Sequence, residues 1–211
     1  MSLLAGGSAG GMFPDPVYVT VDEGGLLIRV HRTGQGPIFF GPSPGRAPMN
    51  RFDAPAREYR LLYAAERLEG AFVETILRRP SGRILRREYV NQRSWTALRL
   101  GRPLVLAKLH GEGLQAYGVD AGQLGIDDYR HSRALALSIF THLPAIDGLA
   151  YRSRYNNDEI CYAVFDRVAA TDFSIARQES FDTIPDRVDQ LMRLHRAVFD
   201  RSSPIPDPPA A

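Results

Sequence analysis

Residues 59–76 read YRLLYAAERLEGAFVETI, and the spacing of the apolar side chains changes halfway along this stretch. Residues 61–65 form a short apolar run that is typical of a buried strand. A helix is predicted over residues 66–78, because side chains recur there at helical spacing: Leu68, Ala71, Phe72, Thr75 and Ile76. Pro80 and Gly82 are expected to end that helix.

Outward from this stretch, strands and helices alternate without a regular order. Residues 17–21 and 26–30 are apolar and flank Asp22-Glu23-Gly24-Gly25, which predicts a hairpin. Further strands are predicted at residues 37–40, 104–109, 148–151 and 160–165. Helices are predicted at residues 91–100, from Asp127 or Asp128 to about Leu143, and at 185–200 behind a capping Thr183. The lack of a regular βαβ rhythm favours an α+β fold over a doubly wound sheet.

Length and composition indicate one domain with tails. The chain has 211 residues, of which 44% are hydrophobic, enough for one packed core. We expect a flexible N-terminal tail at 1–15, a single domain at 16–201 and a loose Pro-rich tail at 202–211. The net charge of +2 argues against direct nucleic-acid binding. No apolar run approaches the roughly 18 residues that a membrane span needs.

Several kinds of chemistry are excluded by the residues present. Cys161 is the single cysteine, so the chain has no internal disulfide or cysteine-based zinc site, and a cytoplasmic location is expected. The sequence has no Gly-rich dinucleotide loop, no phosphate loop and no helix with paired zinc-binding histidines. Apart from Lys108, its positive side chains are arginines, which suit bidentate phosphate contacts, although a GC-rich genome explains the excess more simply.

Three local groups of polar residues remain as candidates for a site. They are residues 50–55 after a Pro- and Gly-rich loop, the pair Tyr63 and Glu74, and Tyr151-Arg152-Ser153-Arg154 in a polar turn. Glu74 falls off the apolar face of its helix, and Gly70 lies one turn earlier on the same side. Two interpretations of Gly70 are open. In the first, Gly70 leaves open space beside the Glu74 carboxylate. In the second, Gly70 lets another element pack closely, and Glu74 is solvated. Periodicity alone favours the second interpretation.

The order and spacing of several motifs resemble the RES domain family, which is named for one Arg, one Glu and one Ser. The resemblance covers residues 26 to about 167, and Ala64 is smaller than the family leads us to expect. The motifs that carry it are Leu27-Ile28-Arg29-Val30-His31-Arg32, Pro37-Ile38-Phe39-Phe40-Gly41-Pro42, Asn50-Arg51-Phe52-Asp53-Ala54-Pro55, residues 59–65, Ala71-Phe72-Val73-Glu74-Thr75, residues 148–154 and residues 161–166.

The resemblance implies a fold and a set of site residues. The fold would be a mixed sheet similar to that of ADP-ribosyltransferases, with flanking helices. Carried over by position, the catalytic residues would be Arg51, Glu74 and Ser153. Arg29 and Tyr63, together with Arg51 and Ser153, would bind NAD as the substrate, without a metal. A carboxylate suits the oxocarbenium-like ribose that forms when the nicotinamide bond breaks, and arginines suit the pyrophosphate.

The resemblance also implies an activity and a partner. The chain would be a toxin that cleaves the nicotinamide–ribose bond of NAD by hydrolysis or phosphorolysis. The same residues would serve a protein ADP-ribosyltransferase, and the sequence does not separate the two. A non-catalytic interaction protein is a third hypothesis, which intact Arg51, Glu74 and Ser153 disfavour. The expected partner is a separate helix-turn-helix antitoxin, and a homodimer is left open.

Overall fold

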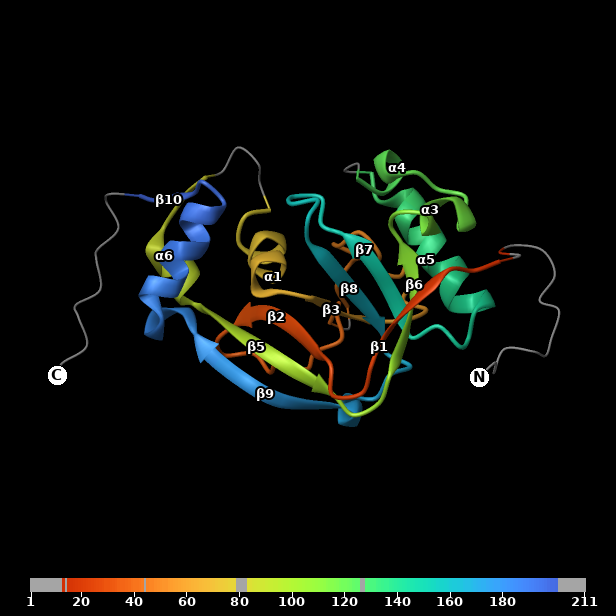
Figure 1. The fold of residues 1–211 in the computed structure, drawn as a ribbon, viewed down its shortest axis with the longest axis horizontal. Helices are drawn as coiled ribbons and strands as arrows, with labels where there is room; N and C mark the ends of the chain where they lie inside the picture. Colours follow the sequence, from red (N-terminus) through yellow and green to blue (C-terminus); the bar gives the residue numbers. More distant parts are fainter. Residues whose placement is uncertain (1–12, 14, 44, 79–82, 126–127, 201–211) are drawn as a thin grey trace.

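One mixed sheet of eight strands organises the chain (Figure 1). The computed structural model describes residues 13, 15–43, 45–78, 83–125 and 128–200. In spatial order the strands are β1 (Tyr18–Val21), β6 (Leu104–Leu109), β7 (Gly148–Arg152), β8 (Ile160–Phe165), β3 (Leu61–Ala65), β2 (Leu26–Arg32), β5 (Arg93–Leu100) and β9 (Phe173–Ser180). β6 and β7 run parallel, and every other neighbouring pair in this sheet is antiparallel. The predicted α+β class is therefore confirmed.

Helices lie over the middle and at the two ends of this sheet. In Figure 1, α1 is central, α6 lies at one end, and α3, α4 and α5 lie at the other. Their bounds are α1 (Leu68–Thr75), α2 (Arg87–Asn91), α3 (Gly113–Ala116), α4 (Ala121–Gly125), α5 (Arg130–His142) and α6 (Pro185–Leu194), with 3-10 turns at Ala170–Asp172 and Phe181–Thr183. A parallel pair, β4 (Ile84–Leu85) and β10 (Val198–Phe199), stands apart beside α6. Within the described ranges, no helix is both long and apolar enough to cross a bilayer.

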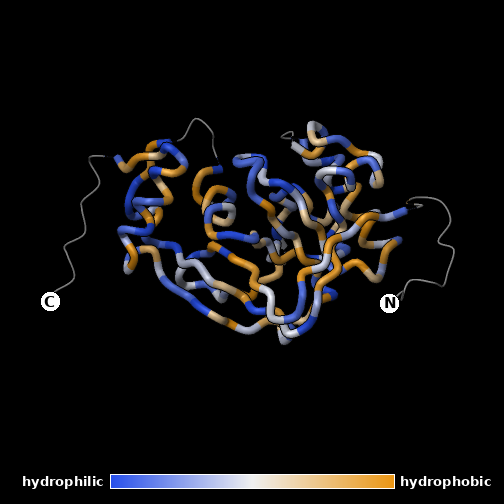
Figure 2. The backbone as a smooth tube through the Cα atoms, in the orientation of Figure 1, coloured by the Kyte–Doolittle hydropathy of each residue, from blue (hydrophilic) through white to orange (hydrophobic). Residues whose placement is uncertain are grey.

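β3 lies between β2 and β8 in the sheet, and both of its faces are buried. Side chains alternate across a strand, so Leu61 and Ala65 join the core beneath α1, whereas Leu62 and Ala64 join a second core on the opposite face. In Figure 2 the apolar colour is concentrated on the inner strands and α1, and β9 becomes hydrophilic toward its C-terminal end. The position of β3 therefore fixes α1 and the loop before β3 relative to the rest of the sheet.

The predicted hairpin between residues 17–21 and 26–30 is wrong. Both runs are strands, but β1 pairs with β6, and β2 pairs with β3 and β5. Gly24, with a φ of 79°, donates its N–H to the carbonyl of Leu100, and the N–H of Leu100 donates to the carbonyl of Gly25. The turn is thus bonded to the end of β5, which directs the two strands to different neighbours.

Three other local predictions are corrected. Residues 91–100 are mostly strand β5, because this segment pairs with β2 on one side and β9 on the other. Residues 37–40 form no strand, and the chain joins the sheet only through a bridge between Gly41 and Leu61. The last helix ends at Leu194, and Thr183 does not cap it, because its hydroxyl donates to the carbonyl of Ser180 at 2.8 Å.

The tail predictions lie almost wholly outside the described residues. Residues 1–12, 14 and 201–211 are not described, so the expected tails at 1–15 and 202–211 stay predictions. Within the predicted domain, the strands at 61–65, 104–109, 148–151 and 160–165 are confirmed. The helices predicted after residues 66 and 127 are confirmed as α1 and α5, with later starts and earlier ends.

Candidate functional site

A cavity of about 230 Å³ is lined by residues of β2, β3 and α1, of the loop before β3 and of the turn after β7. Among the residues that the structure describes, the lining has one carboxylate but several arginines and tyrosines: Glu74; Arg29, Arg51, Arg78 and Arg154; Tyr63, Tyr129, Tyr151 and Tyr155. The positive charges outnumber the negative one, so the cavity favours an anionic ligand. The tyrosines add flat faces against which a planar ring can stack.

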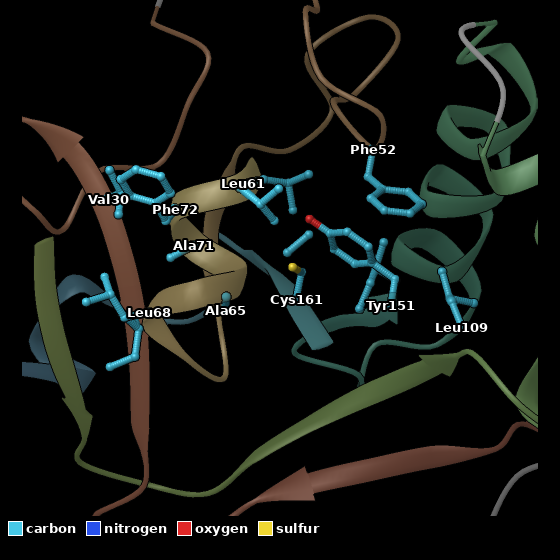
Figure 3. Close-up of a cluster of buried hydrophobic side chains, with 14 of the residues drawn as sticks. Val30, Phe52, Leu61, Ala65, Leu68, Ala71, Phe72, Leu109, Tyr151 and Cys161 are labelled. Atoms are coloured by element: carbon cyan, nitrogen blue, oxygen red, sulfur yellow. The ribbon is translucent and has the colours of Figure 1, made fainter. Parts of the chain in front are cut away.

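Arg51 and Glu74 come from different segments and meet in this cavity. The Nη2 atom of Arg51 lies 4.0 Å from Oε1 of Glu74. Nη1 of Arg51 donates to the carbonyl of Arg152 at 3.4 Å, and the guanidinium lies 5.1 Å from the centre of the Tyr151 ring. Figure 3 shows the Tyr151 ring beside Phe52 and Cys161. Arg51 therefore extends from the loop before β3 and contacts both α1 and β7.

Two buried polar atoms in the lining lack partners. Oε1 of Glu74 and Nε of Arg29 make no hydrogen bond with any residue that the structure describes. Nη1 of Arg29 donates to the carbonyl of Tyr63 at 3.2 Å. Burial lowers the pKa of Arg29 to about 10, so the guanidinium is still charged at neutral pH. Because buried polar groups are normally satisfied, the cavity suits a ligand that brings both donors and acceptors.

Tyr63 connects the site to the loop that carries Arg51. Its hydroxyl donates to Oδ1 of Asp53 at 2.9 Å and accepts the N–H of Phe52 at 3.2 Å. Oδ2 of Asp53 accepts the N–H groups of Met49 and Asn50, at 2.8 and 2.7 Å. Burial and the neighbouring Asp53 carboxylate raise the pKa of Tyr63 well above its usual value, so the hydroxyl keeps its proton. The hydroxyl therefore holds the loop in place, and Tyr63 is also part of the cavity lining.

Ser153 lies beside this cavity and is absent from its lining. The side chain is 2% exposed, and its Oγ accepts the N–H groups of Tyr155 and Asn156 at 3.1 and 3.2 Å. These bonds form a tight turn that carries Arg154 and Tyr155 into the lining. Ser153 also lines a neighbouring cavity, of about 270 Å³. Of the residues predicted for the site, Arg29, Arg51, Tyr63 and Glu74 line one cavity, and Ser153 adjoins it.

An ion pair between a buried carboxylate and an exposed arginine fastens that turn to the start of α1. The Glu159 carboxylate is 3% exposed and accepts two bonds from Arg67, at 2.5 and 3.2 Å. The Glu159 carbonyl accepts the N–H of Ser153 at 2.9 Å. A Cβ on Gly70 would lie only 3.1 Å from the Glu159 side chain. Gly70 therefore permits close packing against Glu159, which supports the second interpretation of this glycine and gives it no role beside Glu74.

Some lining residues were missed by sequence reasoning. Tyr151 and Arg154 belong to the third polar group, but they received no defined role in the site. Tyr129 carried no signal, because it lies between the matched motifs. It precedes α5, and its hydroxyl accepts a bond from Arg154 at 3.3 Å. The sequence gives Arg78 no role beyond the end of a predicted helix; in the structure it lies three residues beyond α1 and lines the cavity.

The fold and the cavity define a class of protein: an α+β domain whose sheet, central helix and polar turn enclose a cationic, tyrosine-lined cavity that contains the Glu74 carboxylate. The chain belongs to the RES domain family, whose model, described as "RES domain", matches residues 26–184. That match includes every predicted site residue. The family assignment made from the sequence motifs is thus confirmed.

A solved structure supports the same fold. The chain is similar to one in the crystal structure of the M. tuberculosis MbcT–MbcA toxin–antitoxin complex, with a TM-score of 0.65 and 12% sequence identity. The alignment covers 82% of this chain and 92% of that chain. At this level of identity the likeness shows a shared fold. A search of curated proteins found no significant match.

Proposed function

We propose that this protein is a toxin that consumes NAD by breaking its nicotinamide–ribose bond. The observation that carries the proposal is the pair of unsatisfied buried atoms, Oε1 of Glu74 and Nε of Arg29, in one cationic cavity. Membership of the RES domain family and a fold shared with a chain of a toxin–antitoxin complex support it. NAD brings ribose hydroxyl donors for the carboxylate and pyrophosphate acceptors for the guanidinium.

Glu74 is the residue proposed to lower the barrier of the reaction. When the bond to nicotinamide breaks, the ribose becomes oxocarbenium-like and carries positive charge. A carboxylate held beside that charge stabilises the transition state more than the ground state. The Arg51 guanidinium, 4.0 Å from Oε1 of Glu74, helps to orient the carboxylate. The same Oε1 accepts a ribose hydroxyl, which fixes the sugar in place.

The other site residues are proposed to bind and orient the substrate. Arg29 and Arg51 bind the pyrophosphate through charge-assisted hydrogen bonds. The ring of Tyr63 faces the nicotinamide, which is cationic before cleavage. Ser153 acts through the turn that its Oγ closes, because this turn holds Arg154 and Tyr155 in the lining. These contacts provide proximity and charge stabilisation, and the proposed reaction uses no metal.

The products of the reaction test the proposal. Purified protein is incubated with NAD, with and without inorganic phosphate, and the products are separated. Hydrolysis releases nicotinamide and ADP-ribose, because water attacks the ribose. Phosphorolysis releases nicotinamide and a phosphate ester of ADP-ribose. Transfer to a protein, the alternative use of the same site, instead labels a protein band when the adenylate of NAD carries the label. Absence of nicotinamide release under all conditions refutes the proposal.

The proposed partner is a separate antitoxin of the helix-turn-helix class, and the proposed location is the cytoplasm, where NAD is available. The support is the toxin–antitoxin complex that contains the similar chain.

Induced expression of this chain alone is expected to stop bacterial growth and lower cellular NAD. The Glu74→Gln variant, expressed to the same level, is expected to do neither. Growth arrest by both proteins contradicts a toxin that acts through NAD cleavage.

A further inference from the structure

A second cavity, of about 270 Å³, lies beside the first and shares part of its wall. Arg51, Tyr151 and Arg154 line both cavities. Each cavity alone is smaller than the roughly 300–1,000 Å³ of a typical small-molecule site, whereas the two together fall within that range. The structure therefore offers two neighbouring compartments whose shared wall includes one tyrosine and two arginines.

The second compartment differs in chemistry from the first. Its walls are mainly apolar and include Leu109, Leu114 and Leu124. No carboxylate is among the described residues that line it, and its polar groups include His110 and Asn157. Burial and the nearby cations of Lys108 and Arg152 lower the pKa of His110. A neutral imidazole offers one donor and one acceptor, which matches the polar edge of an uncharged heteroaromatic base.

The arrangement of charge along the two cavities matches a dinucleotide. A dinucleotide has a base and ribose at each end and two negative charges in the middle. Here the shared arginines, Arg51 and Arg154, stand at the boundary, where a pyrophosphate would cross from one cavity to the other. The carboxylate Glu74 belongs to the first cavity alone. The second cavity therefore faces the half of the ligand that does not react.

We infer that the second cavity binds the adenosine half of the dinucleotide, with the purine between its leucine walls and its polar edge toward His110 and Asn157. The inference rests on the proposed function for the identity of the dinucleotide. Its basis is the shared arginine boundary and the apolar lining. Because this half takes no part in bond breaking, its contacts are made equally in the ground state and the transition state, and they set KM more than kcat.

The test fills the second cavity and compares two substrates. Gly125 lines this cavity, and a Cβ there meets open space at an unstrained φ, so Gly125→Trp introduces bulk without a backbone clash. Gly34→Trp is the matched control, because a Cβ at Gly34 also meets open space and Gly34 lines neither cavity. Leu114→Trp is the second blocking variant. The substrates are NAD and nicotinamide mononucleotide, which has the same scissile bond and no adenosine.

We expect Gly125→Trp to raise KM for NAD about tenfold or more, with turnover of nicotinamide mononucleotide unchanged. Gly34→Trp is expected to match the wild type on both substrates. Unchanged NAD kinetics in both blocking variants, or equal losses on both substrates in folded protein, overturn the inference. A calorimetric titration with AMP tests the adenosine site without any turnover. The titration therefore still gives an answer if the wild type cleaves neither substrate and the proposed function fails. AMP binding that is lost in Gly125→Trp supports the adenosine site, and absent or unaltered AMP binding refutes it.

Discussion

Replacement of Glu74 by glutamine separates catalysis from folding most sharply. The amide keeps the shape of the side chain and removes its charge. The partner charge on Arg51 lies 4.0 Å away and the Glu74 side chain is 21% exposed, so this weak, partly solvated pair contributes about 1 kcal/mol or less to stability. By contrast, losing a group that stabilises transition-state charge costs about 2.7–4 kcal/mol, or roughly 10²- to 10³-fold in kcat.

The assay measures nicotinamide release and denaturant unfolding on the same preparation. Glu66→Gln is the matched control, because Glu66 is an exposed carboxylate just before α1 and does not line the cavity. We expect Glu74→Gln to lose at least 100-fold in kcat while both variants unfold near the wild-type midpoint. If purified Glu74→Gln turns over NAD at the wild-type rate, Glu74 does not stabilise the reacting ribose, and the mechanism is wrong.

Three further results are expected. Arg51→Lys keeps the charge but loses the planar fork, so NAD consumption is expected to fall about tenfold or more; a lower melting temperature with normal activity per folded molecule would make Arg51 structural. Tyr63→Phe removes the bond to Asp53 and is expected to cost about 1.5–3 kcal/mol in unfolding free energy, with faster hydrogen exchange in residues 49–53; unchanged exchange would contradict this role. Stability is expected to fall as the pH drops below 6.5, because burial lowers the pKa of three histidines and the unfolded chain then binds more protons: His31, His110 and His195. A denaturation midpoint that stays unchanged as the pH is lowered from 7.5 to 5.5 would contradict this expectation.

Local pattern predicted those elements whose burial follows from their own sequence. β3 is apolar on both faces, and α5 has a clear helical stripe, so both were found. β5 was mistaken for a helix because its conformation is set by seven residue pairs with β2 and by β9, which local sequence does not reveal. The last helix was predicted too long because Arg196 adopts a φ of 52°, after which Val198 pairs with Ile84.

The site was less accessible to residue-level reasoning than the fold. Periodicity favoured a solvated Glu74, and the family resemblance, with its characteristic order of motifs, was needed to connect it with Arg51. Those two residues are 23 positions apart and meet only through tertiary packing. The resemblance did not show that Ser153 faces its own turn, because a residue's partners are not encoded in a motif. Tyr129 and Arg78 were missed for the same reason.

The strand order also determines when a newly made chain acquires its cavity. β3 carries Tyr63 and lies between β2, which carries Arg29, and β8, whose residues follow those of β3 by about a hundred positions. Arg154 and Tyr155 belong to the connection just before β8. During synthesis, the ribosome has exposed Arg51 and Glu74 long before their opposing wall exists. The cell therefore has an interval, set by the rate of translation, in which the protein is present but has no site.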